Sequence, residues 1–142
     1  MISENGLSPS ILLALQRATH RTLNAVTAAV ADLDLTASEI NALANLADGH
    51  KRNVRELSAD TGTRPTTLTG VLDRLERRGY LTRELDAFDR RSFRLALTAR
   101  GRTVAARVRR AVADLERDAL TTVSPRQVAG YHAVVAALQE VS

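Results

Sequence analysis

The chain of 142 residues contains no cysteine, no tryptophan, two phenylalanines, two tyrosines and a single lysine. The absence of cysteine excludes disulfide bonds, thiolate metal sites and cysteine-based redox chemistry. No apolar run approaches the ~18 residues that a membrane helix needs. The first residues also lack the charged-then-apolar pattern of a secretory signal. We therefore expect no membrane partner and a cytoplasmic location.

The positive charge of the chain is concentrated in one segment. The net charge is +4. Residues 51–102 hold thirteen basic and seven acidic side chains, a net +6, whereas the flanking segments together carry a net −2. Nearly all of the basic residues are arginine, whose guanidinium binds phosphate through two parallel hydrogen bonds. An arginine-rich surface without function would have the same composition, but its concentration in one segment favours duplex DNA as the partner.

Two helix starts stand out in the first third of the chain. Ser8-Pro9 is typical of an N-cap followed by proline at the first helical position, and the helix that it predicts ends near Asp32. Thr36-Ala-Ser-Glu39 is a capping box, in which each side chain accepts a hydrogen bond from the other residue's backbone amide. A second helix is therefore expected from position 37 to a glycine stop at position 49.

A helix-turn-helix pattern occupies residues 53–79. Asn53-Val-Arg-Glu56 has the form of another capping box and opens a short helix that ends before Gly62. A further helix begins near Pro65, and its apolar residues recur at helical spacing. A short helix, a glycine turn and a second helix are the parts of a helix-turn-helix.

A hairpin and two further helices complete the pattern. Residues 81–85 and 93–97 alternate apolar with polar side chains, which predicts two strands with one buried face, joined by a charged loop. Thr98 is expected to cap a long helix. Ser124-Pro125 again combines an N-cap serine with proline at the first helical position, which predicts a last helix.

These residues resemble the MarR family of winged helix-turn-helix regulators. The resemblance rests on three segments that occur in order: Thr66-Thr67-Leu68-Thr69, Asp73-Arg-Leu-Glu-Arg-Arg-Gly79, and Asp89-Arg-Arg91 followed by Leu97-Thr-Ala-Arg-Gly101. It implies a mainly α fold with a small β-wing and with dimerisation helices at both ends. One MarR-type domain would span residues 1–142, with a DNA-binding lobe at about 36–98 and dimerisation helices at about 8–32 and 99–142.

Two positions depart from the family pattern. Ser58 replaces a usual alanine where close packing requires a small residue, and serine still fits there. Arg64 stands where a serine cap is common, so Thr63 or a backbone group is expected to cap the helix instead.

The resemblance also implies which residues contact DNA. A recognition helix presents its N-terminal residues to the base edges of the major groove, and a wing arginine enters the adjacent minor groove. Asp89 is expected to hold an arginine rather than to touch DNA. The predicted recognition-helix residues are Arg64, Pro65, Thr66, Thr67, Thr69, Gly70 and Arg74; the wing residues are Asp89, Arg90 and Arg91; the phosphate contacts are Arg77 and Arg78.

Several of these residues have a plain structural alternative. The threonines form an ordinary polar helix face if no DNA binds there, and Arg74 can form an ion pair within the fold. Gly70 either lets the helix approach DNA closely or has no role. His20, His50 and His132 are isolated, so no metal site is expected. No nucleophile motif is present, so we expect neither an active site nor a cofactor.

Two functions remain open at this point. The resemblance implies a homodimeric transcriptional regulator, usually a repressor, whose operator is a pseudo-palindrome. It also implies a small effector, often an aromatic or phenolic anion, that binds where the dimerisation helices meet the winged lobe and changes the spacing of the two lobes. The alternative is a winged-helix module that contacts proteins or binds the nucleoid without specificity, and that has no inducer.

Overall fold

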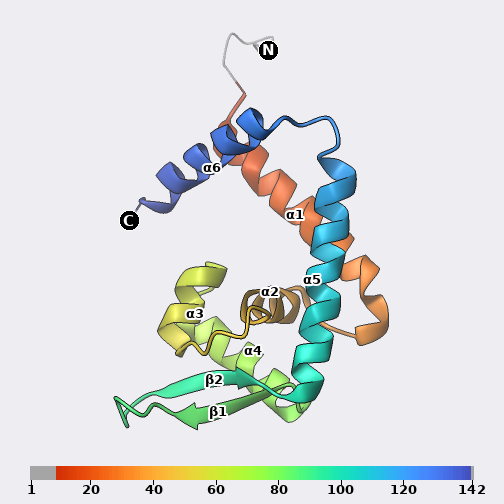
Figure 1. Ribbon diagram of the computed structural model, residues 1–142. Coiled ribbons are helices and arrows are strands. Elements are labelled where there is room, and N and C mark those ends of the chain that lie inside the picture. The colour runs from red at the N-terminus through yellow and green to blue at the C-terminus, as the bar shows by residue number, and fades with distance from the viewer. Residues whose placement is uncertain (1–8, 142) are drawn as a thin grey trace.

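The computed structural model describes residues 9–141 and shows a helical protein with one β-hairpin (Figure 1). The elements in chain order are α1 (Ile11–Ala29), η1 (Ala31–Leu33), α2 (Ala37–Leu46), α3 (Val54–Thr61), α4 (Pro65–Arg77), β1 (Leu81–Leu85), β2 (Phe93–Leu97), α5 (Ala99–Ala119) and α6 (Pro125–Gln139). The predicted mainly α fold with a small β-wing is confirmed.

The core lies where α2, α3, α4, the base of the hairpin and the first half of α5 meet. Leucine dominates it because Leu fills a helix interface at little cost in rotamer freedom. Burial of these side chains is the main favourable term for the lobe. Its fully buried large side chains are Ile40, Leu43, Leu46, Leu57, Leu68, Val71, Leu72, Leu75, Leu81, Leu95 and Val108.

The hairpin has the predicted strands but not the predicted buried face. β1 and β2 pair antiparallel from Leu81 opposite Leu97 to Leu85 opposite Phe93. Only Leu81 and Leu95 are buried, because α4 covers the hairpin at its base and ends before its tip. The alternation therefore predicted the strands correctly and overstated the burial of the outer half, where Leu85 and Phe93 are exposed.

Both ends of α1 differ from the sequence prediction. The cap of α1 is Ser10, whose Oγ accepts from the Leu13 amide at 3.2 Å; Pro9 precedes the helix, and the predicted cap Ser8 lies outside the described residues. The helix ends at Ala29, because the chain turns through η1 and Asp34 takes a left-handed conformation at φ 52°.

The cap of α3 is simpler than predicted. The Asn53 side chain accepts from the Glu56 amide at 2.8 Å, but the return bond of a capping box is not formed. The boxes at Thr36 and Ser124 are complete.

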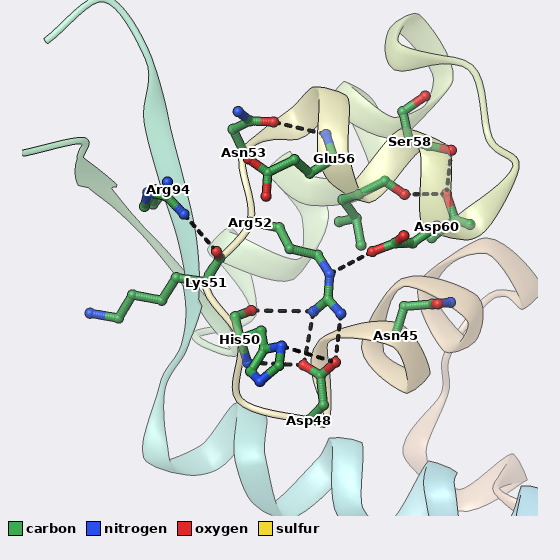
Figure 2. Close-up of polar contacts among 12 residues, drawn as sticks. Asn45, Asp48, His50, Lys51, Arg52, Asn53, Glu56, Ser58, Asp60 and Arg94 are labelled. Carbon is green, nitrogen blue, oxygen red and sulfur yellow. Dashed lines mark hydrogen bonds and ion pairs between the residues drawn. The ribbon is translucent and has the colours of Figure 1, made fainter. Parts of the chain in front are cut away.

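Arg52 ties the loop between α2 and α3 to both helices and to the wing (Figure 2). Its guanidinium donates to the Asp48 carboxylate and, at 2.6 Å, to Asp60 on α3, while its carbonyl accepts from the Leu95 amide at 2.7 Å. The hydrogen bonds from Arg52 hold the pKa of Asp48 well below its ordinary value. The loop is thereby fixed as an additional short segment along β2.

The wing is also fastened to α4 and to α5. Arg83 of β1 bridges Asp73 at 2.6 Å and Glu76 at 3.2 Å. At the base of the hairpin, where β2 ends, the Thr98 hydroxyl donates to the Gly79 carbonyl at 2.6 Å. The same hydroxyl caps α5 by accepting from the Gly101 amide. These contacts set the angle between wing and α4.

Gly101, in the first turn of α5, lies directly against the backbone of Tyr80. A Cβ at this position would fall 1.9 Å from the Tyr80 carbonyl oxygen, so no side chain fits without a shift of the backbone. At Gly70, in the middle of α4, a Cβ would find only the Arg74 guanidinium at 3.7 Å, which is an ordinary contact.

These two glycines make a matched pair of substitutions. We expect Gly101→Ala to lower the free energy of unfolding by about 1–3 kcal/mol, as overpacking does. Gly70→Ala should raise it by about 0.5–1 kcal/mol, because alanine loses less backbone entropy in a helix. Urea unfolding of both variants without DNA measures the two effects. A Gly101→Ala variant as stable as the wild type would contradict the packing of Gly101.

Candidate nucleic-acid interface

Helix α4 is amphipathic and presents its first turn to solvent. Its apolar residues Leu68, Val71, Leu72 and Leu75 are buried in the core. Pro65, Thr66 and Thr67 are exposed, and no acidic residue lies in the first turn. Thr69 is exposed as well, but its hydroxyl donates to the Pro65 carbonyl at 2.9 Å. Thr66 and Thr67 therefore keep free hydroxyls for an external partner, and Thr69 offers mainly its methyl group.

The start of α4 is uncapped by any side chain. Arg64 occupies the cap position and makes no capping hydrogen bond, so the expected replacement cap at Thr63 is wrong. The Thr63 carbonyl instead accepts from the hydroxyl of Ser58, which fixes the turn between α3 and α4. The first backbone amides of a helix attract anions when no side chain satisfies them. The start of α4 therefore combines free amides with an exposed arginine.

Arg74 and Arg78 both face the buried carboxylate of Glu39. Arg74 Nε lies 3.9 Å from one carboxylate oxygen, and Arg78 Nη1 lies 3.7 Å from the other, which accepts no hydrogen bond within the described chain. Arg74 stays about half exposed, so it is free to reach a phosphate as well.

Arg78 is held within the fold. Its guanidinium donates to the carbonyls of Asp34 at 2.6 Å and Leu33 at 2.8 Å, and it lies over the ring of Tyr80 at 5.1 Å. The phosphate contact predicted for Arg78 stays a prediction that this geometry does not favour. Arg77 is exposed and makes only a 3.4 Å bond to the Asp73 carbonyl of its own helix.

The wing tip presents Arg90 and Arg91 to solvent. Neither guanidinium makes a hydrogen bond or an ion pair with any described residue. Asp89 is predicted to hold an arginine, and it holds Arg91 by its backbone and not by its guanidinium. Its carboxylate accepts from the backbone amide of Arg91 at 3.0 Å and its carbonyl accepts from Ser92, so Asp89 shapes the turn.

Arg94 and Asp86 support this loop from below. Arg94 Nε lies 3.2 Å from the Asp86 carboxylate, and its Nη1 donates to the Lys51 carbonyl at 2.9 Å (Figure 2). A hydrogen bond from the Phe88 amide, aided by the charge of Arg94, lowers the pKa of Asp86. The loop is therefore a defined turn and not a flexible tip.

A second concave surface lies between the winged lobe and the terminal helices. This cleft of about 710 Å³ has mainly apolar walls, and Glu116 is the acidic residue in its lining. Its lining comes from α1, α2, α5, α6 and the segment between the last two. The lining includes Thr22, Leu23, Val26, Asn41, Val112, Leu120, Gln127 and Tyr131.

Asn41 connects this cleft with the helix-turn-helix. Its side-chain amide donates to the carbonyl of Thr61, the last residue of α3, at 3.2 Å. Asn45, one turn later, donates to both the carbonyl and the side chain of Asn41. Sequence reasoning missed this link, because the partners are twenty residues apart and only the packing of α2 on α3 joins them.

The described part of the chain offers neither a metal-binding cluster nor a membrane-spanning helix. Residues 9–141 bring together no group of His, Asp and Glu side chains able to hold a metal ion. No helix in that range is long and apolar enough to cross a membrane.

Comparison with known proteins agrees with this geometry. Residues 33–92 match the model of the MarR family. The chain is 27% identical over 101 residues to the HTH-type transcriptional regulator SarZ of Staphylococcus saprophyticus, a match that covers 71% of this chain and 69% of the relative.

Solved structures share the fold over nearly the whole chain. The crystal structure of NadR in complex with 4-hydroxyphenylacetate has a TM-score of 0.83 at 20% identity and covers 95% of this chain and 96% of its own; that likeness concerns the fold alone. CouR from Rhodococcus jostii, bound to p-coumaroyl-CoA, has a TM-score of 0.82 at 25% identity and covers 94% of each chain. Together, the family model over residues 33–92 and these relatives support a MarR-family winged helix-turn-helix transcriptional regulator.

Proposed function

We propose that the chain is a ligand-responsive repressor that binds a pseudo-palindromic operator as a homodimer. The observation that carries this proposal is the outer surface of the lobe. The first turn of α4, without acidic residues, and the two wing arginines, which are unpaired within the described residues, are both exposed. The ion pair of Arg83 with Asp73 and the hydrogen bond from the Leu95 amide to the Arg52 carbonyl fix the wing. One helix fills a major groove, and a wing reaches the neighbouring minor groove.

The apolar faces of the terminal helices are exposed in a single chain, which supports a second copy of the chain as their partner. None of the residues of α6 is buried, and only Val26 is buried in α1. Isolated helices with exposed apolar faces are unstable in water, so these faces require a partner. Two-fold association through the same surface would place two copies of α4 on one face of a duplex. The exposed large apolar side chains in and beside these terminal helices are Ile11, Leu12, Leu13, Leu120, Tyr131, Val134 and Val141.

The operator and the stoichiometry follow from that symmetry. We expect the protected DNA to be an imperfect palindrome with half-sites about 10 bp apart, bound by two chains. Footprinting on the DNA beside the gene, with light scattering of the complex, measures both. Protection of one asymmetric half-site by a single chain would contradict the dimer. Binding that competitor DNA abolishes would favour the non-specific module instead.

The wing and the recognition helix should contribute different kinds of binding energy. Arg91→Ala removes one positive charge, so binding to operator and to unrelated duplex should weaken alike, with the salt slope flattened by roughly one phosphate. Thr67→Ala removes a neutral group that faces a base edge. It should cost about 1 kcal/mol on the operator alone and leave the salt slope unchanged.

Binding isotherms over a salt series, on operator and scrambled duplexes, separate these two variants. If Arg91→Ala changes which sequence is preferred while Thr67→Ala has no effect on the operator, the grooves are assigned the wrong way round.

The cleft is proposed as the effector site. Its volume lies in the range of small-molecule pockets. Hydroxyl and amide groups line it, but no arginine or lysine of this chain does. We therefore propose an aromatic effector with hydrogen-bonding substituents. A ligand that competes for the Asn41 amide would loosen its bond to Thr61 and so free the turn before α4.

A pair of probes tests the chemistry of the cleft. A ligand that binds the folded state raises the melting temperature. We expect neutral 4-hydroxyphenylacetamide to raise it at least as much as the 4-hydroxyphenylacetate anion, since Glu116 repels a carboxylate there. Asn41→Ala removes the amide for which the ligand competes, so it should reduce both this stabilisation and the effect of the probe on operator affinity. A shift with the anion alone would overturn the proposed electrostatics.

A further inference from the structure

The outer end of the wing carries an apolar cluster that the fold does not use. Phe88 is 97% exposed, Leu85 is 57% exposed and Phe93 is 48% exposed. We call these three residues the apolar wing tip. Both phenylalanines of the chain belong to it. Large apolar side chains in water are unfavourable, and clusters of them mark contact surfaces.

The position of Phe88 is defined by the backbone of the loop. Its amide donates to the Asp86 carboxylate at 2.9 Å, and the Asp86 amide donates to the Ser92 carbonyl at 3.1 Å. The Ser92 amide in turn donates to the Asp89 carbonyl at 3.1 Å. Asp86 is itself buried against Arg94. A fixed turn thus places the most exposed large apolar residue of the described chain next to the wing arginines.

The charges around the apolar wing tip indicate its partner. Arg90 and Arg91 follow two and three residues later and are unpaired within the described chain. Of the nearby acids, Asp86 pairs with Arg94 and Glu84 pairs with Lys51 at 2.7 Å. The Asp89 carboxylate accepts from the Arg91 backbone amide and forms no ion pair with a described residue, so the two arginines outnumber the one unpaired acid. An apolar surface framed by free arginines suits a polyanion with apolar edges, and the minor groove, with sugars between two rows of phosphates, has that character.

We propose that Phe88 enters the minor groove beside Arg91 as an apolar wedge, with Leu85 and Phe93 against the neighbouring sugars. This inference rests on the proposed DNA binding and adds a determinant of specificity to it. Apolar wedges partly unstack one base step, and pyrimidine–purine steps unstack most readily. The wing would then select a deformable step in addition to binding phosphates.

Phe88→Ala and Phe88→Leu test the wedge. We expect Phe88→Ala to weaken operator binding roughly ten-fold, as the loss of one base contact does, with an unchanged salt slope because no charge is removed. Phe88→Leu should retain most of the affinity, because leucine also serves as a wedge. Both variants should melt like the wild type, since the ring is exposed.

The DNA supplies the second measurement. In two operator duplexes the step under the wing is either TG or part of an A-tract, and 2-aminopurine beside that step reports unstacking. The wild type should prefer the TG duplex and raise the fluorescence, and Phe88→Ala should do neither. The salt slope of Arg91→Ala, measured in parallel, shows whether the wing reaches DNA at all.

The possible outcomes separate the wedge from the proposed function. If Arg91→Ala weakens binding and Phe88→Ala does not, the wedge is wrong and the proposed function stands. If Phe88→Ala leaves DNA binding unchanged but lowers self-association, the apolar wing tip is a protein contact and the wedge is likewise overturned. If the wild type binds no duplex above background, the proposed function itself fails.

Discussion

The inner face of α4 is the constraint on which the rest of this structure depends. Leu68, Val71, Leu72 and Leu75 are buried together with leucines of α2, α3 and the hairpin. That packing fixes which face of α4 points outward and therefore which residues a duplex can meet. It also explains why Gly70 is tolerated in mid-helix, because the buried side chains on both sides hold the helix in place.

The fold divides its arginines between internal and external partners. Arg52, Arg83 and Arg94 neutralise carboxylates that join the α2–α3 loop, α4 and the wing. Arg78 holds the joint between η1 and α2. Among the predicted DNA contacts, the exposed arginines therefore lie at the start and on the outer face of α4 and at the wing tip. DNA would therefore contact rigid parts of the lobe, which limits the conformational entropy lost on association.

The terminal helices carry the two further roles that we propose, dimerisation and effector binding. They leave apolar faces exposed in one chain and enclose a cleft against α2, from which Asn41 reaches the turn before α4. The surface that we propose for dimerisation and the cleft that we propose for an effector are therefore contiguous. A ligand there would act on the spacing of two lobes and on the helix-turn-helix at once.

The sequence by itself determined the elements, since capping boxes, glycine stops and helical or alternating periodicity are local signals: Thr36, Thr98 and Ser124 cap as predicted, and both strands have the predicted bounds. It also located the basic segment. Only the tertiary structure decided what each charged or apolar side chain meets. Arg78 and Asn41 have partners set by packing between distant segments, and the outer wing is exposed beyond the core that buries Leu81 and Leu95. Periodicity gives the side of a strand on which a residue lies, but the extent of the covering element decides whether that side is buried.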